Sequence, residues 1–120
     1  MPKVRVSIFQ RETNFETYAA GDVIFSAGDP GDCMYAVKRG QVEIRVGDRV
    51  VETMEKGEIF GEMALLDDAP RSATAVAAEE CDIVPVDKER FTSLVQQTPL
   101  FALQVMQAMA ERLRKANAAN

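Results

Sequence analysis

The chain has 120 residues, a length that suits one domain with a buried hydrophobic core. Hydrophobic residues make up 47% of it and charged residues 28%, as in an ordinary globular protein, which excludes a disordered tail. The formal charge is −5, from 14 basic and 19 acidic side chains. This acidic balance excludes a general nucleic-acid binder but leaves room for one arginine that holds one small anion.

The sequence contains no histidine and two cysteines, Cys33 and Cys81. Catalytic pairs and metal sites built on histidine are therefore excluded, and two thiols are too few for a four-thiolate zinc site. We expect neither a metal nor a cofactor. The apolar neighbours of the cysteines favour free thiols in a reducing cytoplasm. We see no secretory signal and no apolar run long enough to span a bilayer, so we expect a cytoplasmic protein without a membrane partner.

Short apolar runs separated by glycine turns fill the first two thirds of the chain. Alternation of apolar and polar residues predicts a half-buried strand over 4–8, and Gly47-Asp48 is a predicted hairpin turn. Further strands are predicted over 15–18, 23–25, 34–37, 42–46, 49–54, 59–60, 73–77 and 81–86. About eight short strands at this spacing predict a mainly β protein, an antiparallel, jelly-roll-like β-roll over residues 4–86.

The pattern becomes helical after Pro85. Asp87 is a predicted N-cap, and Thr98-Pro99 begins a second helix, so helices are expected over 87–116 of a single domain that spans 1–120. The last residues, 116–120, are expected to fray. Cations in the last turn suit the helix dipole; these are Arg112, Arg114 and Lys115.

An apolar stripe runs along the second helix at spacings of three and four, and consists of Leu103, Met106, Ala110 and Leu113. The stripe is expected to pack either on its own roll or on a second chain. Further apolar residues, Phe101, Val105 and Met109, widen it beyond what a surface helix needs. This width favours a homodimer through the C-terminal helix.

The segment 61–71 interrupts the strands with helix-forming residues. A short helix exposes free backbone N–H groups at its start, and Gly61 lets a ligand approach them closely. Arg71 offers a guanidinium that can grip two oxygens of one phosphate. The Glu62 carboxylate cannot hold a phosphate but can accept hydrogen bonds from a ribose hydroxyl. The segment therefore suits a phosphorylated sugar.

The segment 60–74 closely resembles the phosphate-binding cassette of cyclic nucleotide-binding domains. It combines Phe60-Gly61-Glu62 with Pro70-Arg71-Ser72-Ala73-Thr74. Segments 20–25, 28–35 and 40–44 also look like this family's strands and turns, so the resemblance covers residues 12 to 113. The family includes bacterial catabolite activators and regulatory subunits of cyclic-AMP-dependent protein kinase.

The resemblance implies a fold with a short phosphate-cassette helix and C-terminal lid helices. It also implies a set of ligand-binding residues: Gly61, Glu62, Met63, Ala64, Arg71, Ser72 and Ala73. Glu62 would accept the ribose 2′-hydroxyl, Arg71 would pair with an exocyclic phosphate oxygen, and the amides of Gly61, Glu62 and Ala64 would donate to the ligand. Ser72 leaves cyclic AMP and cyclic GMP both open. Gly40, Val42 and Ile44 would form the wall that meets the base.

Simpler roles remain for three of these residues. Arg71 could pair with Asp67 or Asp68 on the surface, Glu62 could merely stabilise a helix start, and Ser72 could satisfy a local backbone group. The catabolite activators carry a DNA-reading motif after the long helix. The sequence ends at Asn120 without one, so DNA is not expected as a partner.

Three functions compete at this point. The favoured one is a non-enzymatic sensor of a cyclic nucleotide, cyclic AMP before cyclic GMP, in which the ligand repositions the C-terminal helix and an unknown protein effector responds. The second is a protein-interaction domain that keeps the fold and works without ligand. The third is an enzyme on a similar roll, such as a metal-dependent cupin, which the missing histidines argue against.

Overall fold

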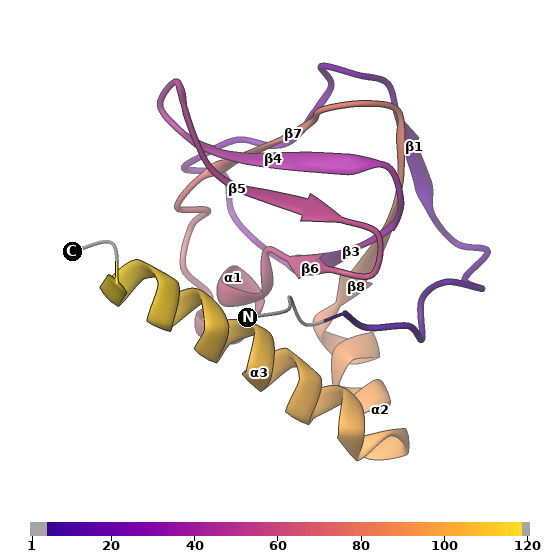
Figure 1. The fold of residues 1–120 in the computed structure, drawn as a ribbon. Coiled ribbons are helices and arrows are strands. Elements are labelled where there is room, and N and C mark those ends of the chain that lie inside the picture. Colours follow the sequence, from indigo (N-terminus) through magenta and orange to yellow (C-terminus); the bar gives the residue numbers. More distant parts are fainter. Residues whose placement is uncertain (1–4, 119–120) are drawn as a thin grey trace.

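The structure, a computed structural model, describes residues 5–118. Within these residues the strands are β1 (Glu16–Tyr18), β2 (Val23–Phe25), β3 (Cys33–Arg39), β4 (Gln41–Val46), β5 (Arg49–Glu55), β6 (Ile59–Phe60), β7 (Thr74–Ala77) and β8 (Cys81–Asp87). The helices are α1 (Glu62–Asp67), α2 (Lys88–Gln97) and α3 (Pro99–Ala118). This element order confirms the predicted antiparallel roll with a short inserted helix and C-terminal helices (Figure 1).

Two four-stranded sheets form the roll, in the orders β1-β8-β3-β6 and β2-β7-β4-β5. The chain leaves the first sheet for the second at Gly40, between β3 and β4. Gly40 has a φ of 93°, and a Cβ there would lie 2.5 Å from the Glu80 carbonyl oxygen. Only glycine meets both demands, so this turn depends on it. The predicted hairpin is also present: β4 pairs with β5, with Ile44 opposite Glu52.

Buried side chains form two hydrophobic clusters. The one between the roll and the C-terminal helices contains Val6, Phe9, Met34, Ala36, Ile59, Leu65, Val84, Val86, Phe101, Val105 and Ala108. The one inside the roll contains Val37, Val42, Met54, Phe60, Ala75, Ala77, Cys81 and Ile83. The first cluster fastens α3 to the roll, which fixes where the helix lies relative to α1.

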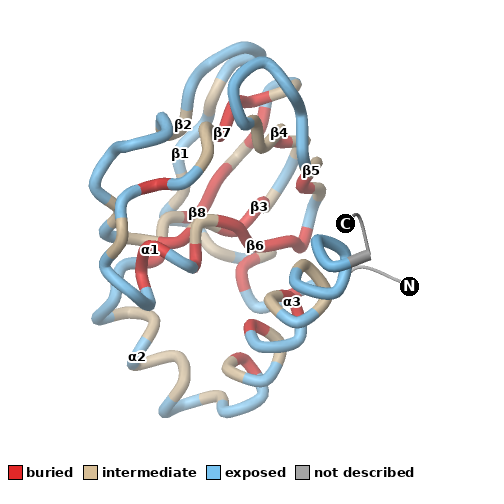
Figure 2. The backbone as a smooth tube through the Cα atoms, turned by 90° about the vertical axis from the view of Figure 1, so that its left-hand side faces the viewer, coloured by how far each residue is buried: buried red, intermediate tan, exposed pale blue. Residues whose placement is uncertain are grey.

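The C-terminal helices begin where the sequence predicts. The Asp87 side chain accepts a hydrogen bond from the Arg90 amide and caps α2, and α3 begins at Pro99. Only one face of α3 packs on the roll: Phe101, Val105 and Ala108 are buried (Figure 2). The stripe of Leu103, Met106, Ala110 and Leu113 lies on the exposed side of α3. The residues that seemed to widen the stripe are therefore largely the ones that bind the helix to its own roll.

The predicted strand over 4–8 is wrong for its described residues. Positions 5–7 are irregular and 8–11 form a turn, in which the Gln10 amide donates to the Ser7 carbonyl. Val6 and Phe9 are both 1% exposed, whereas Ile8 is 40% exposed. A spacing of three between buried residues is that of a turn. Packing against α3 favours this turn over a strand, because the Phe9 and Phe101 rings meet edge to face with centroids 5.8 Å apart. The predicted fraying also fails at 116–118, where α3 continues; positions 119–120 lie outside the described residues.

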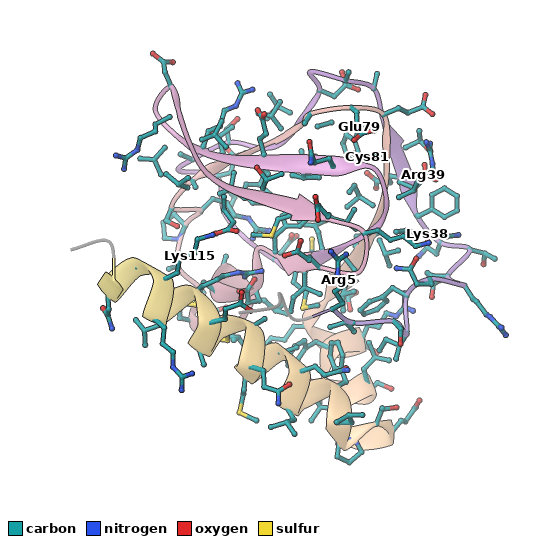
Figure 3. The ribbon with its side chains drawn as sticks, viewed as in Figure 1. Arg5, Lys38, Arg39, Glu79, Cys81 and Lys115 are labelled. Atoms are coloured by element: carbon teal, nitrogen blue, oxygen red, sulfur yellow. The ribbon has the colours of Figure 1, made fainter. Side chains whose placement is uncertain are left out.

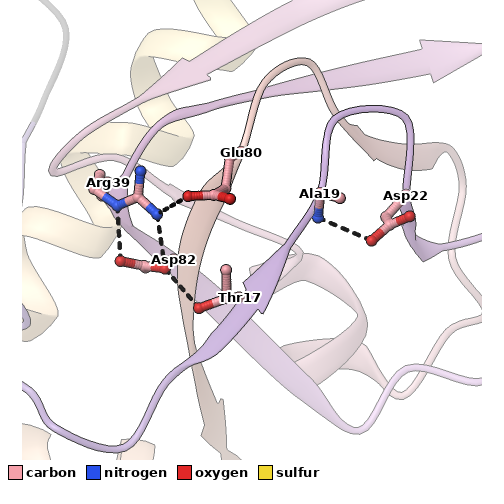
Figure 4. Close-up of polar contacts among 6 residues, drawn as sticks. All are labelled: Thr17, Ala19, Asp22, Arg39, Glu80 and Asp82. Atoms are coloured by element: carbon pink, nitrogen blue, oxygen red, sulfur yellow. Dashed lines mark hydrogen bonds and ion pairs between the residues drawn. The ribbon is translucent and has the colours of Figure 1, made fainter.

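A polar cluster fastens the first sheet. Arg39 on β3 donates to Asp82 at 2.9 Å and to Glu80 at 2.8 Å, and the Thr17 hydroxyl donates to Asp82 at 2.8 Å (Figure 4). The hydrogen bond from Arg39 holds the pKa of the Asp82 carboxyl below its ordinary value. These contacts tie β1, β3 and β8 together through side chains.

Both cysteines are free thiols, as the sequence predicts, with Cys81 buried and Cys33 half-buried. Burial raises the pKa of the Cys81 thiol to about 11. Among residues 5–118, none of the helices has the length and apolar character that a bilayer-spanning segment requires.

Candidate ligand-binding site

A cavity of about 1030 Å³ opens between the β4–β5 hairpin, α1 with the loop that follows it, and the C-terminal part of α3. The seven cassette residues named from the sequence as ligand-binding all line this cavity, namely Gly61, Glu62, Met63, Ala64, Arg71, Ser72 and Ala73. Its volume lies at the upper end of the range typical of small-molecule sites. The local motif and the long-range fold thus bring the same residues to one concave surface.

Arg71 is turned into the protein and is only 6% exposed. Its Nη1 donates to the Gly61 carbonyl at 2.7 Å and its Nη2 to the Cys33 carbonyl at 2.6 Å. The guanidinium carbon lies 4.2 Å from the centroid of the Phe25 ring. These contacts argue against the surface pairing with Asp67 or Asp68 and fix the guanidinium at the cavity wall.

These contacts fix the position of the Arg71 guanidinium but do not neutralise its charge. Carbonyls and an aromatic face are dipoles and quadrupoles, not anions. The nearby Cys33 thiol does not supply one either, because burial raises its pKa. The Arg71 Nε is buried without a hydrogen-bond partner. A buried donor on a positive group, without a partner, is what an anionic ligand would satisfy.

Gly61 makes the close approach of Arg71 possible. Its φ is 76°, and a Cβ built on it would lie 2.7 Å from the Arg71 Nη1. Gly31 contributes in the same way, since a Cβ there would lie 3.1 Å from the Arg71 Nε and 2.2 Å from the Ala64 Cβ. Both glycines therefore provide the space that the guanidinium and α1 occupy.

Glu62, the first residue of α1, is 2% exposed. Its Oε1 pairs with the Arg112 guanidinium of α3, which also donates to the Ile59 carbonyl. Its Oε2 is buried without a hydrogen-bond partner. Burying a carboxylate is costly unless its oxygens are satisfied, so Glu62 is more than a favourable charge at a helix start.

The remaining cassette residues differ in exposure. Met63 is 55% exposed and Ala64 is 4% exposed. Ser72 is also exposed at the cavity. Of the wall implied by the resemblance, Ile44 lines the cavity, whereas Val42 is buried inside the roll and Gly40 is packed against the backbone at Glu80. The expectation for Gly40 and Val42 is wrong because the turn at Gly40 packs that residue against Glu80 and Cys81, and Val42 lies in the hydrophobic cluster inside the roll.

Sequence reasoning missed part of the cavity wall. The missed lining residues include Phe25, Val46, Arg49, Val50, Val51, Glu52, Met54, Arg112, Lys115 and Ala116. Lys115 extends from α3 (Figure 3) and pairs with Glu52 of β5 at 3.2 Å. Arg112 and Lys115, expected only to suit the helix dipole, instead join α3 to two carboxylates of the roll. The one local signal for this was their spacing of three, which places them on neighbouring turns of one helical face.

Comparison with known proteins identifies relatives of this chain. A family model described as "Cyclic nucleotide-binding domain" matches residues 15–98. The chain is 37% identical over 117 residues to the "Cyclic AMP receptor protein" of Thermus thermophilus, covering 93% of this chain and 52% of that protein. It is 38% identical over 80 residues to the "cAMP-dependent protein kinase regulatory subunit" of Hypocrea atroviridis, covering 67% of this chain and 17% of that protein.

The structural comparison agrees. The crystal structure of the Thermus thermophilus catabolite activator protein superposes with a TM-score of 0.77 at 36% sequence identity, covering 88% of this chain and 53% of that one. The chain thus spans about half or less of the length of these relatives. Sequence, fold and the lined cavity agree, and the chain belongs to the cyclic nucleotide-binding domain family.

Proposed function

We propose that the chain is a non-enzymatic sensor that binds a cyclic nucleotide in the cavity, with cyclic AMP as the favoured ligand. One observation supports this most strongly. A buried donor on a cation, the Arg71 Nε, and a buried acceptor on an anion, the Glu62 Oε2, both lack a partner and both belong to residues that line one cavity. A phosphorylated sugar supplies the complementary acceptor and donor.

Arg71 binds the phosphate in this proposal. Nη1 and Nη2 each use one N–H group on a carbonyl, and the Nε, whose N–H group has no partner, donates to a phosphate oxygen. The backbone amides of Gly61, Glu62 and Ala64 add donors at the start of α1, and Ser72 and Ala73 complete the loop beside them. A charge-assisted hydrogen bond in a site shielded from water accounts for much of the affinity.

Glu62 binds the ribose. Its unpartnered Oε2 accepts a hydrogen bond from the 2′-hydroxyl, while Oε1 keeps its contact with Arg112. The hydroxyl thus joins a network that already includes α3. Met63, exposed at the cavity, covers the sugar from the side of α1.

The output follows from the position of α3. Arg112 links α3 to the Glu62 carboxylate that binds the ribose. A bound nucleotide therefore changes the free energy of the position in which α3 packs on the roll, and the population of that position shifts. The exposed stripe from Leu103 to Leu113 then offers a surface for a second copy of the chain or for a protein effector. Free thiols at Cys33 and Cys81 suit a reducing cytoplasm.

A second candidate function is favoured by the Arg112 contact itself. Arg112 lines the cavity and supplies a partner from the chain itself for one oxygen of Glu62. A domain held closed in this way could present α3 to a partner without a nucleotide. Intact Glu62 and Arg71, with their unpartnered atoms, favour the sensor over this alternative.

Isothermal titration calorimetry distinguishes the two. We expect the purified chain to bind cyclic AMP with micromolar affinity or better and to bind adenosine, which lacks the phosphate, at least about a hundredfold more weakly. Cyclic GMP, titrated in parallel, gives the base preference. If neither cyclic nucleotide binds more tightly than millimolar, the sensor is excluded and the ligand-independent domain stands.

A further inference from the structure

The β4–β5 wall of the cavity bears a carboxylate on a largely apolar surface. Glu52 lies opposite Ile44 in the register of the hairpin, so the two side chains share one face of the sheet. Val50, Val51 and Met54 line the cavity from the same strand. The Glu52 side chain is 16% exposed, which is low for a glutamate on a strand near a hairpin end.

Glu52 faces α3 across the cavity. The Lys115 Nζ lies 3.2 Å from Oε2 and 3.3 Å from Oε1, and the Lys115 side chain is 61% exposed. Lys115 follows Arg112 by three residues, about 5 Å along the helix axis. Glu62 of α1 and Glu52 of β5 therefore contact α3 one after the other along the helix axis, on the side of α3 that faces the cavity.

The proposed orientation of the ligand leads the base to this place. With the phosphate at Arg71 and the ribose at Glu62, the part of the cavity that remains is bounded by the β4–β5 wall and by Lys115 and Ala116 of α3. An apolar wall suits the faces of a planar base, and a few polar groups in such a wall set specificity. A carboxylate accepts hydrogen bonds only, so it selects a base edge that carries N–H groups.

The geometry points to Glu52 as a specificity-determining residue that accepts a hydrogen bond from an exocyclic amino group of the bound base, while Lys115 couples that contact to α3. This inference rests on the proposed function and adds to it the residue that recognises the base. Adenine and guanine both carry such an amino group, at different ring positions. The inferred ligand class is therefore an amino-purine nucleotide, and analogues that lack one amino group distinguish adenine from guanine.

The test compares each nucleotide with an analogue that lacks one amino group. Cyclic AMP is titrated beside purine riboside 3′,5′-cyclic monophosphate, which lacks the 6-amino group, and cyclic GMP beside cyclic IMP, which lacks the 2-amino group. For the preferred base we expect the wild-type chain to bind the amino form at least about tenfold more tightly, because the analogue lacks one hydrogen bond to a charged acceptor. In Glu52→Leu that ratio falls to about one, and in Glu52→Gln, which keeps an acceptor, it is intermediate.

Two controls separate recognition of the base from support of α3. Glu43→Leu removes a carboxylate from the neighbouring strand, where Glu43 pairs with Arg45 and does not line the cavity, and it should leave the ratio at the wild-type value. Lys115→Gln removes the partner of Glu52 and should change both affinities alike, leaving the ratio intact. Thermal unfolding verifies that each variant is folded.

The outcomes are distinct. A ratio that stays at the wild-type value in Glu52→Leu, with both affinities reduced as in Lys115→Gln, assigns Glu52 a merely structural role and overturns the inference. A wild-type chain that binds the amino and deamino forms equally overturns it as well, while the proposed function stands. A wild-type chain that binds none of the nucleotides overturns the proposed function itself.

Discussion

Arg112 near the end of α3 forms an ion pair with Glu62 at the start of α1, across 50 residues of sequence. Glu62 is 2% exposed, whereas the Arg112 side chain is 29% exposed. The pair joins the helix that would respond to a ligand to the residue that would bind its ribose. In the proposed function, ligand binding and the position of α3 are therefore linked through one shared carboxylate.

The first prediction concerns this pair. Glu62→Gln and Arg112→Gln each remove one charge and leave the other without its partner, so each should lower the free energy of unfolding by about 1–3 kcal/mol. The double variant should be less destabilised than the sum of the single ones. Urea unfolding of the four proteins measures the coupling energy. A coupling energy near zero would show that the contact contributes nothing to the docking of α3.

The second prediction concerns Gly61. Gly61→Ala places a methyl group 2.7 Å from the Arg71 Nη1 and requires alanine at a φ of 76°. We expect stability to fall by about 1–2 kcal/mol from the backbone and cyclic AMP affinity to fall at least about tenfold because the guanidinium moves. Gly47→Ala is the matched control, since Gly47 has a φ of 61° with nothing within 4 Å of its Cβ position. It should show the loss of stability alone; equal affinities for the two variants would contradict the role of Gly61.

The third prediction concerns the exposed stripe on α3. Met106 is 58% exposed and Leu113 is 63% exposed, so Met106→Lys and Leu113→Lys should change the free energy of unfolding of the isolated chain by less than about 0.5 kcal/mol. If the stripe holds two copies together, both variants are monomers in analytical ultracentrifugation at concentrations where the wild type dimerises. Phe101→Ala, at a fully buried position of the same helix, should instead cost about 3–5 kcal/mol. A wild type that is monomeric at all concentrations would assign the stripe to another partner.

The fourth prediction concerns pH. The Arg39 hydrogen bond lowers the pKa of Asp82 in the folded chain, from an ordinary value of 3.8. A carboxyl with a lowered pKa contributes stability above its unfolded value, and this contribution is lost as the pH falls through the folded value. Asp82→Asn should therefore be less stable than the wild type at pH 7, with the difference shrinking below pH 3.8. A difference in unfolding midpoint that stays constant from neutral to acid pH would be incompatible with this assignment.

Local patterns in the sequence predicted most of the fold. Glycine turns and alternating apolar residues located the hairpin at Gly47-Asp48, and capping chemistry located the start of α2 at Asp87. The cassette motif identified every residue proposed to bind the phosphate and the ribose, and all of them line one cavity. These features depend on residues close in sequence, which is why they can be read there.

Long-range contacts explain what the sequence did not reveal. Phe9 packs on Phe101 of α3, and this contact produces a turn where alternation predicts a strand. Arg112 and Glu52 belong to the site through partners 50 and 63 residues away. The local sequence around a charged residue does not indicate which distant carboxylate it contacts. The part of the cavity formed by α3 and the β4–β5 hairpin could therefore be identified only from the structure.

Calorimetric titration of cyclic AMP into wild type and Arg71→Ala tests most directly whether the Arg71 guanidinium holds an anionic ligand. We expect the substitution to weaken binding by about a hundredfold or more, with Arg71→Lys between the two because a lysine restores the charge but not the geometry. Far-ultraviolet circular dichroism on the same samples verifies that the roll is intact. Equal affinity of a folded Arg71→Ala variant and the wild type would contradict the account.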